Sequence, residues 1–253
     1  MDRYILVLLL APLSMTGCAK KIGKVEQQKP FTKECKLPEE QANSLQGKWL
    51  APPIKFSFHT GDFDPSQVSS VQEGAKSWNS FFTASKSTTI FDGGPEGVGH
   101  SSTAAQTTPN CAASTLPDGT VLYKRPSNWT KSATAVAVTT FCFNRPSDGG
   151  QNQIFNAIME FNFQNFFDAS TGRSPDLQSI ALHELGHLLG LDHSCGPLRN
   201  GQPNVACPDA NADPGNYLVL SVMFPQVFFD NSGQGEVKRE LTENDMGRAN
   251  CLY

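Results

Sequence analysis

The feature that most constrains the fold is the run His-Glu-Leu-Gly-His-Leu-Leu-Gly-Leu-Asp-His at residues 183–193. Side chains four positions apart lie on one face of a helix, so His183 and His187 can bind the same small cation. Gly190 can adopt the left-handed conformation that ends a helix and turns the chain, which lets His193 return as a third ligand. The run therefore predicts a helix that ends in a sharp turn and holds a metal ion beside its last turn.

The ligand set and the glutamate beside it point to a catalytic zinc site. Three histidine ligands and one open position are typical of catalytic zinc, whereas structural zinc usually has four protein ligands, often cysteines. Glu184 follows the first histidine, where its carboxylate can accept a proton from a zinc-activated water and act as a general base. In a chain with five histidines, chance would produce this spacing on the order of once in 10⁵ chains. We therefore predict a hydrolytic site with one catalytic zinc ion as its cofactor.

A second motif, Ser-Val-Met-Phe-Pro at residues 221–225, places the zinc motif in a family context. The long zinc motif followed by a methionine-containing turn resembles the metzincin metallopeptidases, and residues 191–194 with residues 223–225 are most similar to the matrixin branch. Astacin-like relatives carry a tyrosine at the position of Pro225, which argues against that branch. The resemblance implies that Met223 forms a hydrophobic floor beneath the three imidazoles and that Pro225 helps to wall a specificity pocket.

The resemblance extends from about residue 50 to residue 253 and implies the fold class. Residues 62–65 leading to residues 75–79 are similar to the first matrixin helix, and residues 241–246 are similar to the last. The expected fold is α+β with α/β layers: a metzincin-like twisted mixed sheet with an edge strand over the cleft, two long helices and a C-terminal helix. The edge strand of such a fold pairs with an extended peptide.

The chain also departs from the animal matrixins. The only candidate for their zinc-capping propeptide cysteine is Cys35, whose surroundings do not match. Their histidine-rich second zinc site has no counterpart, because His59 and His100 are the only other histidines, and we interpret both as ordinary surface or core residues. The connection from His193 to Met223 is much longer than in matrixins, so substrate specificity cannot be transferred.

Local patterns predict the elements that carry these motifs. Strand candidates rich in β-branched and aromatic residues are residues 54–58, 88–91, 121–123, 135–141 and 158–162. Asp64 and Pro65 predict the start of a helix to about Phe82, and Ser174 and Pro175 predict the start of the zinc helix. Our candidate for the substrate-binding edge strand is residues 135–140, and an interior strand is the competing interpretation. The candidate substrate-binding residues are Ala135, Val136, Ala137, Val138 and Pro225.

The amino terminus predicts export. Residues 4–13 are an apolar stretch of signal-peptide length that follows Arg3 and is shorter than a typical bilayer-spanning helix. Residues 15–18 resemble a bacterial lipobox, in which Cys18 would be lipidated. We expect a signal peptide at 1–17, a lysine-rich lipid-anchored tether at 18–48 and a matrixin-like metallopeptidase domain at 49–253. The protein would then be a bacterial membrane-anchored lipoprotein on the outer membrane or cell surface, whereas the alternative is a plain signal peptide with Cys18 an ordinary half-cystine.

The other cysteines predict disulfides. Six remain after Cys18, and an even number in an exported chain suggests three bridges among fifteen conceivable pairings. Cys195 and Cys207 bracket a short segment rich in proline and glycine, so we pair them as a clip on the loop after the zinc helix. By elimination the other candidate pairs are Cys111 with Cys142 and Cys35 with Cys251.

Charge and composition narrow the partners. The chain has 253 residues, a formal net charge of −4 and no basic block outside the tether, so nucleic acid is not an expected partner. Gly, Ser, Thr and Pro crowd residues 92–119, which predicts a long loop that is a candidate to bind calcium or substrate.

The combined prediction is a zinc-dependent endopeptidase that hydrolyses peptide bonds of extended protein substrates, with Glu184 as general base. Two alternatives stay open: a non-catalytic surface lipoprotein that uses a metzincin scaffold for binding, and a zinc amidase that acts on cell-wall peptides. The expected partners are a protein or peptide substrate and, through the lipid, a membrane. We expect a monomer.

Overall fold

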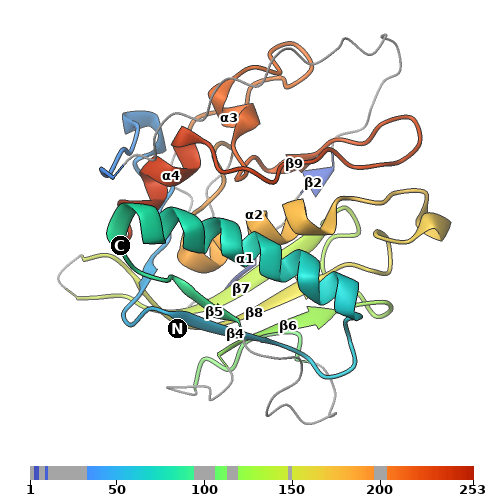
Figure 1. Ribbon diagram of the computed structural model, residues 1–253, viewed down its shortest axis with the longest axis horizontal. Coiled ribbons are helices and arrows are strands. Elements are labelled where there is room, and N and C mark those ends of the chain that lie inside the picture. Colours follow the sequence, from blue (N-terminus) through green and yellow to red (C-terminus); the bar gives the residue numbers. More distant parts are fainter. Residues whose placement is uncertain are drawn as a thin grey trace.

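A twisted mixed sheet forms one layer of the protein, and two helices lie across one of its faces (Figure 1). The computed structural model describes residues 3–5, 9–10, 33–93, 106–112, 119–147, 150–196 and 204–253. The strands are β1 (Arg3–Ile5), β2 (Leu9–Leu10), β3 (Lys48–Trp49), β4 (Ile54–Phe58), β5 (Phe91–Gly93), β6 (Thr120–Lys124), β7 (Ala137–Asn144), β8 (Gln153–Phe161) and β9 (Gln226–Val227). The helices are α1 (Pro65–Lys86), α2 (Leu177–Leu189), α3 (Tyr217–Leu220) and α4 (Glu243–Ala249). This is the predicted α+β architecture.

Most neighbouring strands of the sheet are parallel, and β7 is the exception. In the order β1-β7-β8-β6-β4-β5, strands β4, β5, β6 and β8 are parallel, and β3 pairs with β8 off this path. Strand β7 runs antiparallel to β8 and pairs Thr139 with Met159. Figure 1 shows α3, β9 and α4 on the far side of α2 from the sheet. Helix α2 therefore lies in the middle of the molecule, between the sheet and the C-terminal segments.

Helix α1 begins where the sequence predicted and holds α2 in place. The Asp64 carboxylate accepts hydrogen bonds from the backbone N–H of Ser66 and Gln67, at 2.9 and 3.0 Å, as an N-cap does. On the buried face, the Trp78 indole donates to the carbonyl of Leu182 in α2 at 3.0 Å. The helix ends at Lys86, later than predicted. These contacts fix the helix that carries the histidine motif.

The predicted start of α2 was wrong. The N-cap is Asp176, whose side chain accepts from the backbone N–H of Ser179 at 3.0 Å, and the helix begins at Leu177. Ser174 instead joins the loop to residues near Gly233 by backbone hydrogen bonds. A carboxylate that caps the helix and also pairs with Arg239 is a better N-cap than the Ser-Pro pair two residues earlier.

The predicted strand at residues 88–91 is displaced, since β5 starts at Phe91. The reason is the amide side chain of Asn79 in α1. Its carbonyl oxygen accepts the backbone N–H groups of Ile90 and Phe91, and its amide nitrogen donates to the Phe91 carbonyl. These backbone groups bond to a helix side chain, so the strand forms only from Phe91 onward.

The segment at residues 33–48, which the sequence assigned to the tether, packs against the rest of the protein. The backbone N–H of Lys36 donates to the carbonyl of Gly247 in α4 at 3.0 Å, and Leu45 forms a bridge with Leu191. Gln41 is fully buried. Cys18 and the predicted loop residues 94–105 and 113–118 lie outside the described residues.

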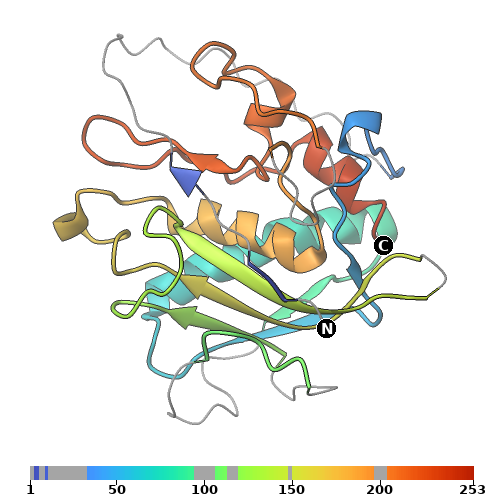
Figure 2. The same ribbon diagram turned by 180° about the vertical axis from the view of Figure 1, so that it is seen from behind.

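Two short strands of the predicted signal segment pair with the body of the protein. Figure 2 shows β1 beside β7, with which it is antiparallel. Strand β2 pairs in parallel with β9. The backbone register joins Ile5 to Thr140 and Leu9 to Gln226. The outer edge of β7 therefore has room for one extended strand.

Three disulfides join the same cysteine pairs that the sequence suggested: Cys35–Cys251, Cys111–Cys142 and Cys195–Cys207. Among the residues that the structure describes, no helix has the length and apolar character needed to cross a bilayer.

Candidate metal centre

The three histidines of the motif converge at the C-terminal end of α2. His183 and His187 lie one turn apart, and Gly190 ends the helix with a φ of 111°. A side chain at Gly190 would also overlap the carbonyl oxygen of Gly47. Both the positive φ and this close approach therefore require glycine at the turn. His193 then returns, and the candidate ligand atoms of the three imidazoles all lie within 4.8 Å of one another. All three side chains are buried.

The hydrogen bonds of two imidazoles aim their other ring nitrogens at each other. His183 Nδ1 lies 2.7 Å from the carbonyl oxygen of Val222, and His187 Nδ1 lies 2.8 Å from that of Leu191. A carbonyl only accepts, so each Nδ1 carries the proton and each Nε2 carries a lone pair. The two Nε2 atoms are 2.9 Å apart, where two lone pairs repel unless a cation or proton lies between them. This donor set fits a zinc ion, because neutral imidazoles oriented through the second nitrogen are typical zinc ligands.

The loop that carries His193 is held by a buried arginine. Arg248 of α4 is fully buried and donates to the carbonyl oxygens of Asp192 and His193 at 3.0 and 3.4 Å. Burial lowers the pKa of the Arg248 guanidinium, and Asp245 and Asp192 oppose this shift. Gln41 adds a hydrogen bond to the carbonyl of Ser194 at 2.6 Å. The third ligand is thus positioned by α4 and by the segment before β3.

The turn that contains Met223 is held by one carboxylate. Asp245 accepts hydrogen bonds from the Ser221 hydroxyl and from the backbone N–H groups of Val222 and Met223. The same carboxylate accepts hydrogen bonds from the backbone N–H and the hydroxyl of Thr242, the N-cap of α4, and completes a capping box. Since Val222 is the residue whose carbonyl orients His183, Asp245 connects α4 to the first ligand.

Met223 packs against the helix between the two histidines. It is fully buried, and a Cβ at Gly186 would overlap its sulfur and approach Trp78 Cζ2 to 3.2 Å. Glycine in a helix interior is normally unfavourable, so Gly186 is explained by the space that the methionine occupies. The contact places Met223 against α2, and a floor position beneath the three imidazoles stays a prediction.

Glu184 contacts the sheet. Its side chain is fully buried, and one carboxylate oxygen, Oε2, lies 2.6 Å from the Thr139 hydroxyl in β7. Of the two, only the hydroxyl carries a proton to donate when the carboxylate is ionised. The glutamate next to the first ligand is therefore hydrogen-bonded to the strand predicted to face the substrate.

A small cavity of about 20 Å³ opens beside His183. Phe224 and Gln226 contribute to its lining, whereas Pro225, the predicted wall residue, is buried and does not line it. Glu236 and Lys238 also line the cavity and form an ion pair with an Oε1–Nζ distance of 3.2 Å. Burial raises the pKa of Glu236, although Lys238 opposes the shift. A cavity of this size holds about one water molecule, so it suits a small group.

The four other predicted substrate-binding residues lie just before β7 and in its first two positions. Ala135, Val136, Ala137 and Val138 are fully buried. The backbone of Ala135 and Val136 is already hydrogen-bonded to Asn162. Ala137 and Val138 lie within the strand and pair with β8 on one side. The part of the opposite edge that accepts β1 is Thr140 to Cys142, a little further along the strand.

An ionic cluster occupies the face of the sheet away from the helices. Glu160 in β8 is 1% exposed and pairs with Arg125 at 2.7 Å and Lys131 at 3.4 Å. Both cations also bond to carbonyl oxygens of residues 106–107. Among the described residues, the three histidines are the only group of three or more His, Cys, Asp or Glu side chains close enough to hold a metal. Residues 106–112, which belong to the loop that was a candidate to bind calcium or substrate, are attached to the sheet by this ionic cluster and by the Cys111–Cys142 disulfide.

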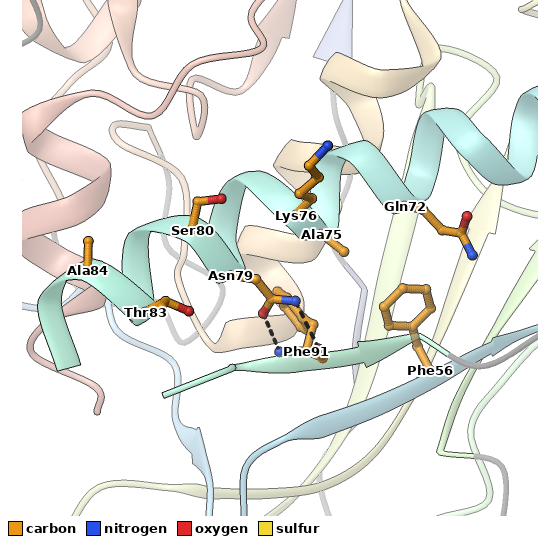
Figure 3. A pocket seen from close by; sticks show the side chains of 9 residues that line it. All are labelled: Phe56, Gln72, Ala75, Lys76, Asn79, Ser80, Thr83, Ala84 and Phe91. Atoms are coloured by element: carbon orange, nitrogen blue, oxygen red, sulfur yellow. Dashed lines mark hydrogen bonds between the residues drawn. The ribbon is translucent and has the colours of Figure 1, made fainter. Parts of the chain in front are cut away.

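A larger hollow lies away from the histidines. It has a volume of about 500 Å³ and lies between α1 and the edge formed by β4 and β5 (Figure 3). One of its two amide side chains, Asn79, is occupied by the hydrogen bonds to Ile90 and Phe91, and the ring of Phe56 forms part of its floor. Neither Glu184 nor the three histidines line it. His59, one of the two remaining histidines, bonds to Asp62 at 3.0 Å, and His100 lies outside the described residues.

Several residues that build the site were not predicted from the sequence: Gln41, Thr139, Gly186, Asp245 and Arg248. A signal existed for Asp245, because Thr242 and Asp245 have capping-box spacing. The contacts of Thr139 and Arg248 join segments far apart in the chain, and such contacts leave no periodic pattern.

The comparisons with known proteins agree with this geometry. The matrixin family model matches residues 79–199, which run from the middle of α1 through all three histidines. No curated protein matches the chain. The match ends before Met223, so the packing of that residue against α2 is independent support. Together, the family match and the cluster of three histidines fit a matrixin-like metzincin.

Proposed function

We propose that the chain is a zinc-dependent endopeptidase that hydrolyses peptide bonds of extended protein substrates. The observation that carries the proposal is the convergence of three buried imidazoles, two of them oriented by backbone carbonyls, beside a buried glutamate. The match to a peptidase family supports the same reaction class.

The residues divide the chemistry between them. His183, His187 and His193 would hold the zinc ion, which when bound lowers the pKa of a water molecule and polarises a carbonyl group. The Glu184 carboxylate accepts a proton from the attacking water and delivers it to the leaving amine. Met223 and Gly186 keep the ligand helix at a fixed distance from the turn below it.

An extended substrate can reach this centre between β7 and β9. Support comes from the chain itself, because its segments β1 and β2 pair with β7 and β9 in the manner of an added strand. Backbone hydrogen bonds to such edges are independent of side chains, which suits a peptidase that accepts varied sequences. The cavity beside His183, with its Glu236–Lys238 pair, would then receive one small substrate side chain.

A proteome-derived peptide library tests the proposal. The full chain should cleave peptides internally, a chelator should stop cleavage, and added zinc should restore it. Glu184→Gln should keep one zinc per chain and lose activity by about 10²–10⁴-fold, whereas the exposed control Glu240→Gln should cleave normally. Zinc binding without cleavage of any peptide would refute the endopeptidase and favour a binding module, and cleavage of cell-wall peptides alone would indicate an amidase.

We also propose that the protein is exported and anchored through a lipid on Cys18. The support is the lipobox-like sequence at residues 15–18 and the three disulfides of the folded part. Labelled fatty acid should be incorporated into the full chain and not into Cys18→Ser. Equal labelling of both proteins would disprove the anchor.

A further inference from the structure

We propose that Thr139 is a positioning residue that fixes the orientation of the Glu184 carboxylate through a hydrogen bond from the sheet. This inference rests on the proposed function, because it assigns Glu184 the role of base. It adds a residue of β7 to the catalytic arrangement and links the strand that would bind substrate to the group that moves the proton.

The contact is short and buried on both sides. The distance from Thr139 Oγ1 to Glu184 Oε2 is 2.6 Å, and both residues are 0% exposed. The Glu184 backbone carbonyl is 3.5 Å from the same hydroxyl, so the carboxylate is the nearer acceptor for its single proton. Hydrogen bonds to an ionised acceptor are shorter and about twice as strong as neutral ones.

A glutamate needs such a restraint to act as a base. The last torsion of its side chain is broad and roughly two-fold, so a carboxylate held only by its stem can turn its oxygens away from the reacting water. A bond to Oε2 restricts that rotation. Thr139 is itself held by the ladder between β7 and β8, where it pairs with Met159, so the restraint is anchored in the sheet.

The next residue along the strand provides a matched control. Thr140 is 1% exposed, and its side chain points to the opposite face of the sheet because neighbours on a strand alternate. Among the described residues its hydroxyl has no hydrogen-bond partner. Thr139→Val and Thr140→Val remove the same hydroxyl from the same strand at the same burial, and only the first touches Glu184.

The variants separate positioning from a structural role. Thr139→Val should lower kcat by about 10- to 100-fold, because a catalytic group that is misplaced by a small distance causes a loss of rate of this size. It should change KM by less than about threefold. Thr139→Ser keeps the hydroxyl and should recover kcat to within about fivefold of the original, and Thr140→Val should leave kcat within about twofold. Zinc content should stay at one ion per chain in all three variants.

A readout without catalysis separates this proposal from the proposed function. Crystal structures of the zinc-loaded variants should show the Glu184 carboxylate rotated or divided between positions in Thr139→Val and unchanged in Thr140→Val. An unmoved carboxylate in Thr139→Val, or equal kcat losses in both valine variants, would overturn the positioning role. If the original protein cleaves no peptide, the proposed function fails, while the carboxylate positions still decide the role of Thr139.

Discussion

A mutation at Gly186 tests how closely Met223 is packed against the zinc helix. A Cβ at this position would overlap the methionine sulfur and approach Trp78 Cζ2 to 3.2 Å, and neither side chain can retreat because both are fully buried. Overpacking of this kind costs about 1–3 kcal/mol, while replacing glycine by alanine in a helix gains about 1 kcal/mol. Gly186→Ala should therefore lower the free energy of unfolding by up to about 2 kcal/mol.

The effect of Gly186→Ala on stability should become more favourable when the methionine is shortened. In Met223→Ala the sulfur is gone and only the 3.2 Å approach to Trp78 Cζ2 remains, so the helix preference of alanine, up to about 1 kcal/mol, is opposed by a smaller packing cost. Urea unfolding of the four metal-free proteins gives the cycle without a contribution from zinc binding. Gly74→Ala is the control, because its Cβ would meet the backbone of Leu182 at 3.1 Å in either background. An equal effect of Gly186→Ala in both backgrounds would refute the packing argument.

Three further predictions concern the ligand, the helix cap and the outer ionic cluster. His193→Ala should weaken zinc binding by more than about 100-fold in competition with a coloured chelator, and unchanged affinity would exclude it as a ligand. Burial acts to raise the pKa of Asp176, but hydrogen bonds, chiefly from Arg239, hold this pKa below its ordinary value. Asp176→Asn should therefore reduce the free energy of unfolding near neutral pH. In urea titrations the original protein should lose stability below about pH 3.9, and the variant should lose less. Arg125→Met leaves the Glu160 carboxylate buried with a weaker partner and should cost up to about 3 kcal/mol of unfolding free energy, whereas Arg125→Met with Glu160→Leu should cost less.

The zinc motif and α1 could be predicted because their signals are local. The spacing of His183 and His187 defines a helix face, and Gly190 is the type of residue that a left-handed turn requires. Asp64 with Pro65 similarly identifies a helix start from adjacent residues. Local rules placed the strands at 54–58 and 121–123 for the same reason, to within one residue at each end.

The errors arose where a distant partner decided the outcome. Ser174 and Pro175 form a good local start signal, but Asp176 also pairs with Arg239, far along the chain, and becomes the cap. Residues 33–48 are poor in apolar side chains, yet Cys35 and the buried Gln41 attach them to α4 and to the ligand loop. Amino-acid composition indicates how much apolar surface a segment can bury by itself, but it does not indicate the contacts that a distant segment provides.

The disulfide between Cys35 and Cys251 has a mechanical consequence. It joins two residues 216 positions apart, one in the segment before β3 and the other just after α4. A pull on the chain ahead of Cys35 is transferred to Cys251, so it cannot peel residues 36–47 from the protein one at a time. Tyr253, two residues further, donates a hydrogen bond to the carbonyl of Leu189 at 2.9 Å. A pull on the chain just ahead of Cys35 is thus transferred to the C-terminal residues, and through Tyr253 it reaches the end of the zinc helix.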